Sequence, residues 1–476
     1  MNKLYINGKW TDSQSGETHN VINPATEEIV DTIPFGRKAD VDLAISAAQK
    51  AFPLWKEINA FERGRILKRI ADKIRENAKE FAVITTKESG KPIAESTGEW
   101  MIAADLFEWF GEEAKRTYGT VIPAGRNNKR MQVIWQPIGV VGVITAWNFP
   151  VWNLARPIGA ALAAGCPVVL KPSNETPLTA MALAKLIEEE GLPQGTFNLV
   201  AGKSSEIGDA LMFSPEIKKV HFVGSTQIGK MLMDKASKTN TKLSLELGGN
   251  APVVIFPDVE VKKLAAAAVL AKFRNCGQVC ISPQRFIVHK DIYKEFTEEA
   301  ARVTAAYKVG NGLDETSQIG PMISKAQQYN VIRLVEESVK AGAKVLAGGE
   351  SHSENGKGYF FKPTLLANVT IDTAAFKEEI FGPIMPVTSF ETMEEAIELA
   401  NHTEYGLAAY IWTNDLNTAI KMSEAIDAGI VGINEWAAHA TEAPFGGIKQ
   451  SGQGSELGHD GIFEYMNKKL ISIGSL

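Results

Sequence analysis

Two cysteines that stand four residues apart are the first candidates for chemistry in this chain of 476 residues. They lie in the segment Asn275-Cys276-Gly277-Gln278-Val279-Cys280, and the chain has one further cysteine, Cys166. A zinc site needs about four ligands, and no second cysteine pair or nearby histidine pair completes one. A disulfide between Cys276 and Cys280 depends on geometry that a sequence does not give. A nucleophile requires a stabilised thiolate, whereas a lone cysteine is most often a small buried hydrophobic residue, which is our interpretation of Cys166.

A second candidate is the carboxylate of Glu246, in the segment Ser244-Leu245-Glu246-Leu247-Gly248-Gly249. Its apolar neighbours predict that Glu246 lies near the end of a buried strand. Burial raises the pKa of a carboxyl group, which suits it to general-base catalysis near neutral pH. The alternative is an exposed glutamate at a sheet edge, and the segment by itself leaves both interpretations open.

A third candidate is a glycine-containing turn that could hold a phosphate. The segment from His221 to Gly229 is typical of a strand, a Gly-Ser-Thr-x-x-Gly turn and the start of a helix. Glycines let the backbone approach a phosphate, and a helix N-terminus favours its negative charge. Thr226 stands where the usual dinucleotide motif has its second glycine, so a pyrophosphate would not lie quite in the usual place. A glycine-rich turn without a ligand is the alternative.

Short apolar strands that alternate with helices are expected to position these residues from about residue 139 onward. Such alternation predicts a parallel sheet with right-handed crossovers. It resumes after Gly248-Gly249, a flexible pair between two strands, so we expect two α/β domains in series with a boundary near this pair. The expected strands are 140–146, 167–170, 196–200 and 219–223 in the first domain and 252–256, 285–289, 343–346, 407–412 and 430–434 in the second.

Three helices can be placed from their boundary residues or their periodicity. Asp40 is expected to cap the first helix, and isoleucines spaced four residues apart over 66–74 indicate the second. Thr176 is expected to cap the third helix, which has Pro177 at its first position and ends by Gly191.

The overall composition excludes several classes of protein. Apolar residues make up 45% and charged residues 22%, unlike a disordered, collagen-like or disulfide-rich chain. The formal net charge is −6 and no Lys/Arg-rich block occurs, so we expect no nucleic-acid partner. No signal peptide is visible, and no apolar run reaches the ~18 residues of a spanning helix, so we expect no membrane association. With three cysteines in so long a chain, we expect a reducing compartment, the cytoplasm.

The motifs together resemble those of the aldehyde dehydrogenase superfamily along nearly the whole chain. Their order and spacing match that family, which favours the chemical interpretation of Glu246 and Cys280 over the alternatives. The matching segments are Asn23-Pro24-Ala25-Thr26, Trp147-Asn148-Phe149-Pro150, Lys171-Pro172-Ser173, Phe222-Val223-Gly224-Ser225-Thr226, Leu245-Glu246-Leu247-Gly248-Gly249, Gly277-Gln278-Val279-Cys280, Glu379-Ile380-Phe381-Gly382-Pro383 and Pro444-Phe445-Gly446-Gly447.

The resemblance implies an α/β fold with three parts. It implies a Rossmann-type NAD(P)-binding domain from 1–117 and 138–248, and a second α/β catalytic domain from 249–450. A small β bridging element is expected from 118–137 and 460–476, within which 129–136 and 469–473 are typical of extended pieces outside both sheets. Family members form dimers or tetramers, so a homodimer or homotetramer is expected, with pairing at these pieces.

The resemblance also implies a mechanism with a small-molecule aldehyde as substrate. Cys280, as a thiolate, attacks the carbonyl carbon, and the oxyanion is bound by the Asn148 side chain and the backbone N–H of Cys280. Hydride transfer to the nicotinamide leaves a thioester, and Glu246 activates the water that releases the acid. Glu456 matches a glutamate often assigned to proton relay, and the alternative is a solvated carboxylate at a helix start. Cys276 is inert or a redox neighbour of Cys280. No metal is expected.

The cofactor residues carry over from the family by position. Lys171 would reach the adenosine ribose, Ser225 the pyrophosphate and Glu379 the nicotinamide ribose, with Phe381 beside it. Many NAD-preferring members have a glutamate three residues after the lysine, where this chain has Asn174. A 2′-phosphate would meet less repulsion there, so we expect use of both NAD and NADP. The remaining residues expected at the cofactor are Ile144, Trp147, Ser173, Gly224, Ile228, Leu247 and Gly248.

The substrate site is most similar to that of the succinate-semialdehyde dehydrogenase branch, which the stretches 98–110, 155–157 and 273–275 resemble. In that branch arginines at the positions of Arg156 and Arg274 hold the distal carboxylate, a task that suits a guanidinium fork, and structural salt bridges are the alternative. The branch also has a serine before Pro-Phe-Gly-Gly, and the loop 436–441 of this chain has none. Trp152 and Trp436 would add aromatic walls, which favour an apolar or aromatic aldehyde. We expect His439 and His459 at the surface.

Other functions are weighed against this interpretation. CoA-acylating relatives usually lack the general-base glutamate, so Glu246 argues against CoA as the acyl acceptor. A non-catalytic protein, such as a crystallin recruited from this family, is disfavoured because Asn148, Glu246 and Cys280 are all retained. A broad-range enzyme or one for aromatic or hydroxylated aldehydes stays as the alternative to succinate semialdehyde.

Overall fold

The structure is a computed structural model that describes residues 3–474. Its first sheet has eight strands in the order β2-β1-β9-β8-β7-β10-β11-β23. The central strands β9, β8, β7, β10 and β11 are parallel, whereas β1 and β23 pair antiparallel with their neighbours. The bounds are β1 Leu4–Ile6, β2 Lys9–Thr11, β7 Val140–Ile144, β8 Val168–Lys171, β9 Phe197–Leu199, β10 Ile217–Val223, β11 Lys242–Glu246 and β23 Gly452–Gln453.

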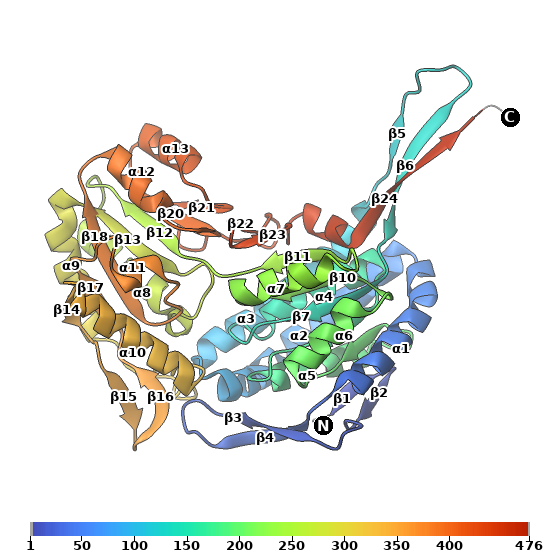
Figure 1. The fold of residues 1–476 in the computed structure, drawn as a ribbon, viewed down its shortest axis with the longest axis horizontal. Helices are drawn as coiled ribbons and strands as arrows, with labels where there is room; N and C mark the ends of the chain where they lie inside the picture. Colours follow the sequence, from blue (N-terminus) through green and yellow to red (C-terminus); the bar gives the residue numbers. More distant parts are fainter. Residues whose placement is uncertain (1–2, 475–476) are drawn as a thin grey trace.

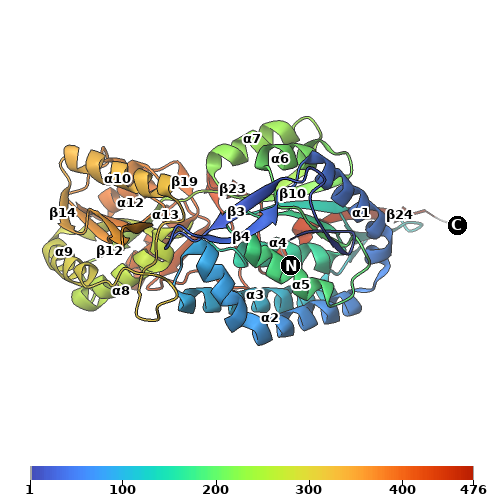
Figure 2. The same cartoon turned by 90° about the horizontal axis from the view of Figure 1, so that it is seen from below.

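Helices cover both faces of this sheet (Figures 1 and 2). Helices α1, α6 and α7 lie on one face, and α4 and α5 lie on the other, with α2 and α3 packed outside them. The core between sheet and helices includes the fully buried indoles of Trp55 and Trp100. The bounds are α1 Lys38–Glu57, α2 Ala60–Ser89, α3 Ile93–Glu113, α4 Trp152–Ala164, α5 Pro177–Glu188, α6 Ser204–Phe213 and α7 Thr226–Ala236.

The second sheet has seven strands in the order β14-β17-β18-β13-β12-β20-β21. All its neighbouring strands are parallel except the edge pair β14 and β17. The bounds are β12 Ala251–Ile255, β13 Pro283–His289, β14 Lys344–Ala347, β17 Thr364–Ala367, β18 Ile384–Phe390, β20 Ala408–Trp412 and β21 Ile430–Ile433. Its helices are α8 Val261–Phe273, α9 Lys290–Ala305, α10 Lys325–Lys340, α11 Ala374–Lys377, α12 Met393–Asn401 and α13 Leu416–Ala425.

The chain passes from the first sheet to the second through residues 247–250, between β11 and β12. Gly249 packs so closely that a Cβ there would collide with the carbonyl oxygen of Cys280. The passage therefore holds Glu246, the last residue of β11, near the loop that carries Cys280.

A three-stranded antiparallel sheet extends away from the body of the molecule (Figure 1). It has the order β24 Met466–Ile473, β6 Arg130–Pro137 and β5 Thr120–Ile122. The extended segments 129–136 and 469–473 thus pair with each other, with Leu470 opposite Val133. The 3-10 helix η3, Asp460–Tyr465, packs on α4 instead of joining this sheet. Residues 1–2 and 475–476, at the ends of the expected first domain and bridging element, lie outside the described residues.

Smaller elements complete the chain. The two-stranded sheets are β3 Thr18–Ile22 with β4 Ile29–Pro34, β15 Ser351–Glu354 with β16 Lys357–Phe361, and β19 Tyr405–Gly406 with β22 Ile448–Lys449. Two further 3-10 helices are η1 Ala114–Arg116 and η2 Arg274–Gly277. Across residues 3–474, no helix combines the length and apolar character that crossing a membrane requires.

Two expected helix caps differ from those in the structure. The first helix begins at Lys38, so Asp40 is its third residue, and the Asp40 carboxylate accepts a hydrogen bond from the backbone N–H of Arg37 at 2.9 Å. Thr176 occupies the N-cap position of α5 without a side-chain cap, because Glu88 of α2 accepts hydrogen bonds from Leu178 and Thr179, each at 2.8 Å. A carboxylate from another helix thus replaces the local cap, which a sequence does not reveal.

Candidate active site

A cavity of about 230 Å³ lies where the carboxyl ends of β7, β10 and β11 face the second sheet. Four residues for which the sequence predicts chemistry line it, namely Asn148, Arg156, Glu246 and Cys280. Seven expected cofactor residues also line it, namely Trp147, Gly224, Ser225, Leu247, Gly248, Glu379 and Phe381. Segments more than 200 residues apart in the chain therefore meet in one cavity, at the sheet edge where ligands bind in open α/β folds.

The amide of Asn148, in the loop after β7, is fixed at both ends. Asn153 donates a hydrogen bond to its Oδ1 at 3.1 Å, and its Nδ2 donates to the carbonyl oxygen of Gln278 at 3.2 Å. An amide nitrogen carries two hydrogens, so one donor is left for the cavity. The contact with Gln278 also ties Asn148 to the segment that ends at Cys280.

A turn of left-handed residues presents Cys280 to the cavity. Asn275, Cys276 and Gly277 have φ angles of 48°, 57° and 70°. A Cβ at Gly277 would collide with the carbonyl oxygen of Gly382, so glycine is required there by contact as well as by φ. Cys276 is buried, with its Sγ 3.5 Å from the Sδ of Met322, and Cys166 is fully buried. All three cysteines are free thiols.

The thiol of Cys280 sits in an environment that disfavours its ionised form. Burial, with the charges of Glu246 and Glu379, raises its pKa to about 12, although Arg156 acts in the opposite direction. Within residues 3–474, no acceptor takes a hydrogen bond from the backbone N–H of Cys280. This N–H is therefore a second free donor beside the Asn148 amide.

Two buried carboxylates, Glu246 in the cavity and Glu456 behind Arg156, have pKa values shifted in opposite directions. Burial raises the pKa of Glu246 well above its ordinary value, the charge of Glu456 raises it further, and Glu246 Oε2 has no hydrogen-bond partner among the described residues. Burial also acts to raise the pKa of Glu456, but Arg156 and His221 outweigh it and leave that pKa below its ordinary value. Carboxyl groups whose environments separate their pKa values are typical of acid–base sites.

Glu456 is buried, not a solvated carboxylate at a helix start. It forms an ion pair with Arg156, and its Oε1 lies 2.5 Å from Nε2 of His221. His221 is fully buried, and its Nδ1 lies 3.1 Å from the hydroxyl of Tyr465. In the sequence, His221 lies within the expected strand 219–223 before the glycine turn, and no local signal indicates that it contacts Glu456.

The cofactor side of the cavity is built from backbone and aromatic groups. Ser225 is the N-cap residue of α7, so the helix N-terminus opens on the cavity that Ser225 lines. The ring of Phe381 packs edge-on against Trp147 with centroids 5.5 Å apart. A Cβ at Gly248 would lie 2.6 Å from Oε2 of Glu379, whose Oε1 accepts a hydrogen bond from the Gly249 N–H at 2.9 Å.

The remaining expected cofactor residues lie outside this cavity. Lys171, Ser173 and Asn174 follow one another at the carboxyl end of β8, beside Ile144 of β7. Burial lowers the pKa of Lys171 to about 8, and its ammonium donates no hydrogen bond to any described residue. The Oδ1 of Asn174 is buried and has no hydrogen-bond partner within residues 3–474. A free donor and a free acceptor three residues apart at the end of β8 fit the hydroxyl groups of a ribose. Ile228 is a partly exposed residue of α7.

The comparison with known proteins agrees with this geometry. The model of the aldehyde dehydrogenase family matches residues 10–471. The chain belongs to the aldehyde dehydrogenase family. The expected fold class is confirmed, since solved aldehyde dehydrogenases superpose on this structure with TM-scores of 0.97–0.98.

Three relatives show which members of the family this aldehyde dehydrogenase resembles. It is 43% identical to the glutarate-semialdehyde dehydrogenase of Pseudomonas putida over 471 residues, which cover 99% of this chain and 97% of that protein. It is 42% identical to the NADP(+) succinate-semialdehyde dehydrogenase of Escherichia coli over 469 residues, with coverage of 98% and 97%. The crystal structure of succinate-semialdehyde dehydrogenase from Burkholderia pseudomallei, 41% identical, has a TM-score of 0.98 and coverage of 100% and 98%.

The two arginines expected to bind substrate have different surroundings in this aldehyde dehydrogenase. Arg156 is fully buried, pairs with Glu456, and lies over the ring of Trp152 at 4.1 Å. Arg274 is partly exposed and lies over the ring of Phe149 at 5.3 Å. No carboxylate within residues 3–474 lies within ion-pair distance of Arg274, although its charge acts on the buried carboxyl group of Glu95 and opposes the rise in the pKa of that group.

A second cavity of about 360 Å³ lies on the other side of the Cys280 loop. Arg274, Val279, Tyr410 and Trp436 are among its lining residues. Its wall combines one cation with aromatic rings, so it can take an anionic tail or an aromatic ring. Trp152 lines neither cavity and instead packs under Arg156.

The expectation that His439 lies at the surface is wrong. Its ring packs edge-on against Trp152 with centroids 5.7 Å apart, and its Nδ1 is buried without a hydrogen-bond partner among the described residues. Burial and the charges of Arg274 and Arg156 lower its pKa to about 4. A neutral imidazole therefore faces the two arginines, because the loop 436–441 folds over Trp152. His459 is exposed, as expected.

Proposed function

We propose that this chain oxidises an aldehyde with a distal carboxylate, namely succinate semialdehyde, to the corresponding acid with NAD or NADP. The observation that supports the proposal is the single cavity lined by Cys280, Asn148 and Glu246. These residues supply a nucleophile, an oxyanion donor and a base. The free cation of Arg274 in the adjoining cavity adds a site for the distal charge.

The first half of the reaction builds a covalent adduct. Sγ of Cys280 loses its proton to solvent water and forms a C–S bond to the aldehyde carbon, and the carbonyl π electrons move onto oxygen. The Asn148 amide and the backbone N–H of Cys280 donate to this oxyanion. Such preorganised donors lower a barrier by about 2.7–4 kcal/mol each. A bound nicotinamide supplies the two-electron acceptor that converts the adduct to a thioester.

The second half releases the acid. Glu246 takes a proton from water as its oxygen bonds to the thioester carbon, and the C–S bond then breaks to regenerate the Cys280 thiolate. The raised pKa of Glu246 suits it to accept a proton near neutral pH. Glu456 stays charged beside Arg156 and His221, and its charge helps to keep the pKa of Glu246 raised.

The cofactor is proposed to lie between the carboxyl end of β8 and the cavity. Lys171 and Asn174 would bind the adenosine ribose, the N-terminus of α7 at Ser225 the pyrophosphate, and Glu379 the nicotinamide ribose. Because Asn174 carries no charge, we propose use of both NAD and NADP.

An aromatic or hydroxylated aldehyde is the second candidate substrate, because Tyr410 and Trp436 line the cavity that contains Arg274. Steady-state kinetics with succinate semialdehyde, propanal and benzaldehyde, each with both cofactors, separates the two. The proposal predicts the highest kcat/KM for succinate semialdehyde and acid as the product without CoA. A higher kcat/KM for benzaldehyde than for succinate semialdehyde would show that aromatic aldehydes are the substrate class.

The three-stranded sheet is proposed to join copies of this chain into a homodimer or homotetramer. Apolar side chains are exposed on it, including Val121 at 81% and Leu470 at 59%. We also propose a reducing, cytoplasmic location, because the catalytic role of Cys280 requires a free thiol and the three cysteines are unpaired. Light scattering of the purified protein measures its molar mass and so tests the proposed oligomeric state.

A further inference from the structure

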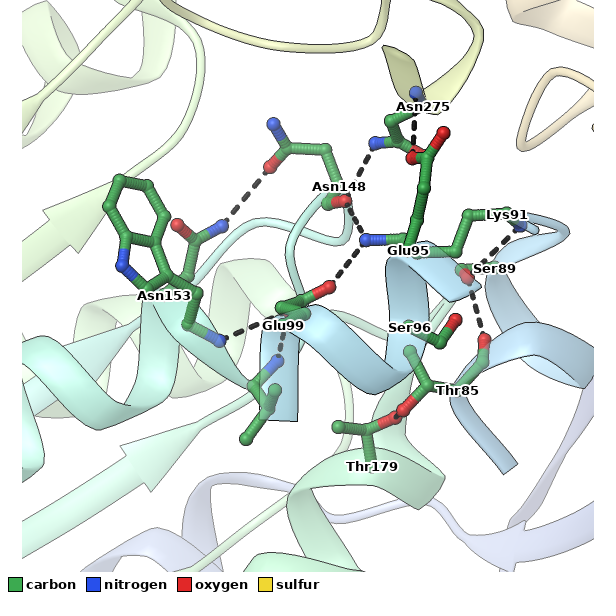
Figure 3. Close-up of polar contacts among 12 residues, drawn as sticks. Thr85, Ser89, Lys91, Glu95, Ser96, Glu99, Asn148, Asn153, Thr179 and Asn275 are labelled. Carbon is green, nitrogen blue, oxygen red and sulfur yellow. Dashed lines mark hydrogen bonds and ion pairs between the residues drawn. The ribbon is translucent and has the colours of Figure 1, made fainter. Parts of the chain in front are cut away.

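A buried lysine that no step above uses, Lys91, contacts the backbone of Asn148. It lies in the short connection between α2 and α3, and its side chain is wholly shielded from solvent. Its ammonium donates to the carbonyl oxygen of Asn148 at 2.8 Å and to Oε2 of Glu99 at 2.5 Å (Figure 3). A charged donor therefore holds the backbone of the residue whose side chain lines the same cavity as the thiol.

The other oxygen of Glu99 binds the start of α4. Its Oε1 accepts hydrogen bonds from the N–H groups of Val151 and Trp152, at 2.8 and 3.1 Å. These are orphan donors at the N-terminus of the helix, where a carboxylate is favoured. Glu99 thus fixes the Asn148 loop at two places. It acts through Lys91 at Asn148 itself, and it binds Val151 and Trp152 directly.

The same helix also holds the turn that carries Cys280. Glu95 lies one helical turn before Glu99 on α3, and its Oε2 accepts a hydrogen bond from the backbone N–H of Asn275 at 2.9 Å. The side chain of Asn275 in turn donates to the carbonyl oxygen of Asn148 at 2.8 Å. One face of α3 therefore connects to both the Asn148 loop and the Cys280 turn (Figure 3).

A buried ion pair is seldom kept for stability, since desolvation offsets much of its attraction. The hydrogen bonds that Lys91 and Glu99 make to the Asn148 loop instead indicate that this ion pair positions the loop. We propose that Lys91, paired with Glu99, is a positioning residue that sets the Asn148 amide at the point where the oxyanion forms. This inference rests on the proposed role of Asn148.

Two reactions of the Cys280 thiol separate positioning from general damage. Acylation by p-nitrophenyl acetate passes through an oxyanion, whereas alkylation by iodoacetamide displaces iodide and forms none. We expect Lys91→Met to slow acylation about 10–100-fold, since a displacement of ~1 Å can cost that much, and to leave alkylation unchanged. Lys91→Arg keeps a charged donor and should recover part of the loss. Equal losses in both reactions would overturn the proposal.

A double-mutant cycle tests whether Lys91 acts through Asn148. In an Asn148→Ala background, Lys91→Met should have no further effect on acylation, whereas additive losses would overturn the inference. If Lys91→Met alone does not fold, Lys91→Met with Glu99→Gln removes both charges and carries the same test. Absence of Cys280 acylation in the wild type would contradict the proposed function, whereas wild-type acylation that Lys91→Met leaves unchanged contradicts this inference alone.

Discussion

Arg156 and Glu456 form a buried ion pair beside the cavity that Cys280 lines. The ion pair neutralises the charge of Arg156. The family resemblance implies that this charge binds the distal carboxylate of the substrate. Arg274, by contrast, has no such partner within residues 3–474 and lines the adjoining cavity. Two arginines that look equivalent in the sequence therefore have different functions available to them.

Replacing Arg274 should weaken binding of a carboxylated substrate alone. We expect Arg274→Ala to raise KM for succinate semialdehyde roughly 10–150-fold, the equivalent of a charge-assisted hydrogen bond of about 1.5–3 kcal/mol. Propanal has no distal charge, so its KM should stay unchanged. Steady-state kinetics on both substrates measures the difference, and an equal rise for propanal would show that the arginine is structural.

Replacing Arg156 should destabilise the fold before it changes specificity. Arg156→Met removes the arginine partner of the buried Glu456 and leaves only the contact with His221, which costs about 3–5 kcal/mol in the free energy of unfolding. Urea unfolding measures this loss, and Arg156→Met with Glu456→Gln should recover most of it. Because the pKa of Glu456 is lowered in the folded state, the stability from this charge is present at neutral pH and is lost as pH falls through the lowered pKa. A variant as stable as the wild type would contradict the ion pair.

Glu246→Gln should separate the two halves of the reaction. The thioester still forms, because Cys280 and Asn148 are intact, but its hydrolysis loses a base worth about 10²–10⁴-fold. Stopped-flow absorbance should show a burst of NAD(P)H followed by slow turnover, and mass spectrometry should find the acyl group on Cys280. Loss of the burst would assign Glu246 to the first half.

The raised pKa of Cys280 predicts how alkylation depends on pH. With a pKa of about 12, the thiolate fraction rises about tenfold for each unit of pH throughout the neutral and mildly alkaline range. The rate of iodoacetamide alkylation of the cofactor-free enzyme should rise in proportion. Cys280→Ser is the control that identifies the reacting residue. A plateau near neutral pH would show that the resting thiol is already ionised.

Glu175 adds a negative charge to the expected adenosine-ribose site. It is exposed beside Lys171 and accepts a hydrogen bond from the hydroxyl of Ser173. Because its charge would repel a 2′-phosphate, Glu175→Gln should raise kcat/KM for NADP more than for NAD. A wild-type preference for NAD above ~1000-fold, or about 4 kcal/mol, would contradict use of both cofactors.

Much of the fold follows from local sequence patterns. The alternation of apolar strands and helices predicts both parallel sheets, because hydrophobic periodicity and turn residues act over short stretches of chain. The short N-terminal strands β1–β4, which form local antiparallel pairs, and the strands β17 and β18 of the second sheet are not among the expected elements. Thr176 is the N-cap residue of α5 as expected, but its side chain makes no cap, because Glu88 reaches the start of α5 from another helix.

The sequence alone determined the chemistry available to this protein, because Cys280, Asn148, Glu246 and the glycine turn are each recognisable in short motifs. The tertiary structure decided what surrounds them. That Glu456 neutralises Arg156, that Arg274 has no ion-pair partner within residues 3–474, that Nδ1 of His439 is buried and that Lys91 holds Asn148 all depend on contacts between segments far apart in the chain. Such contacts set burial and charge, and burial and charge set the pKa values and binding properties that a motif leaves open.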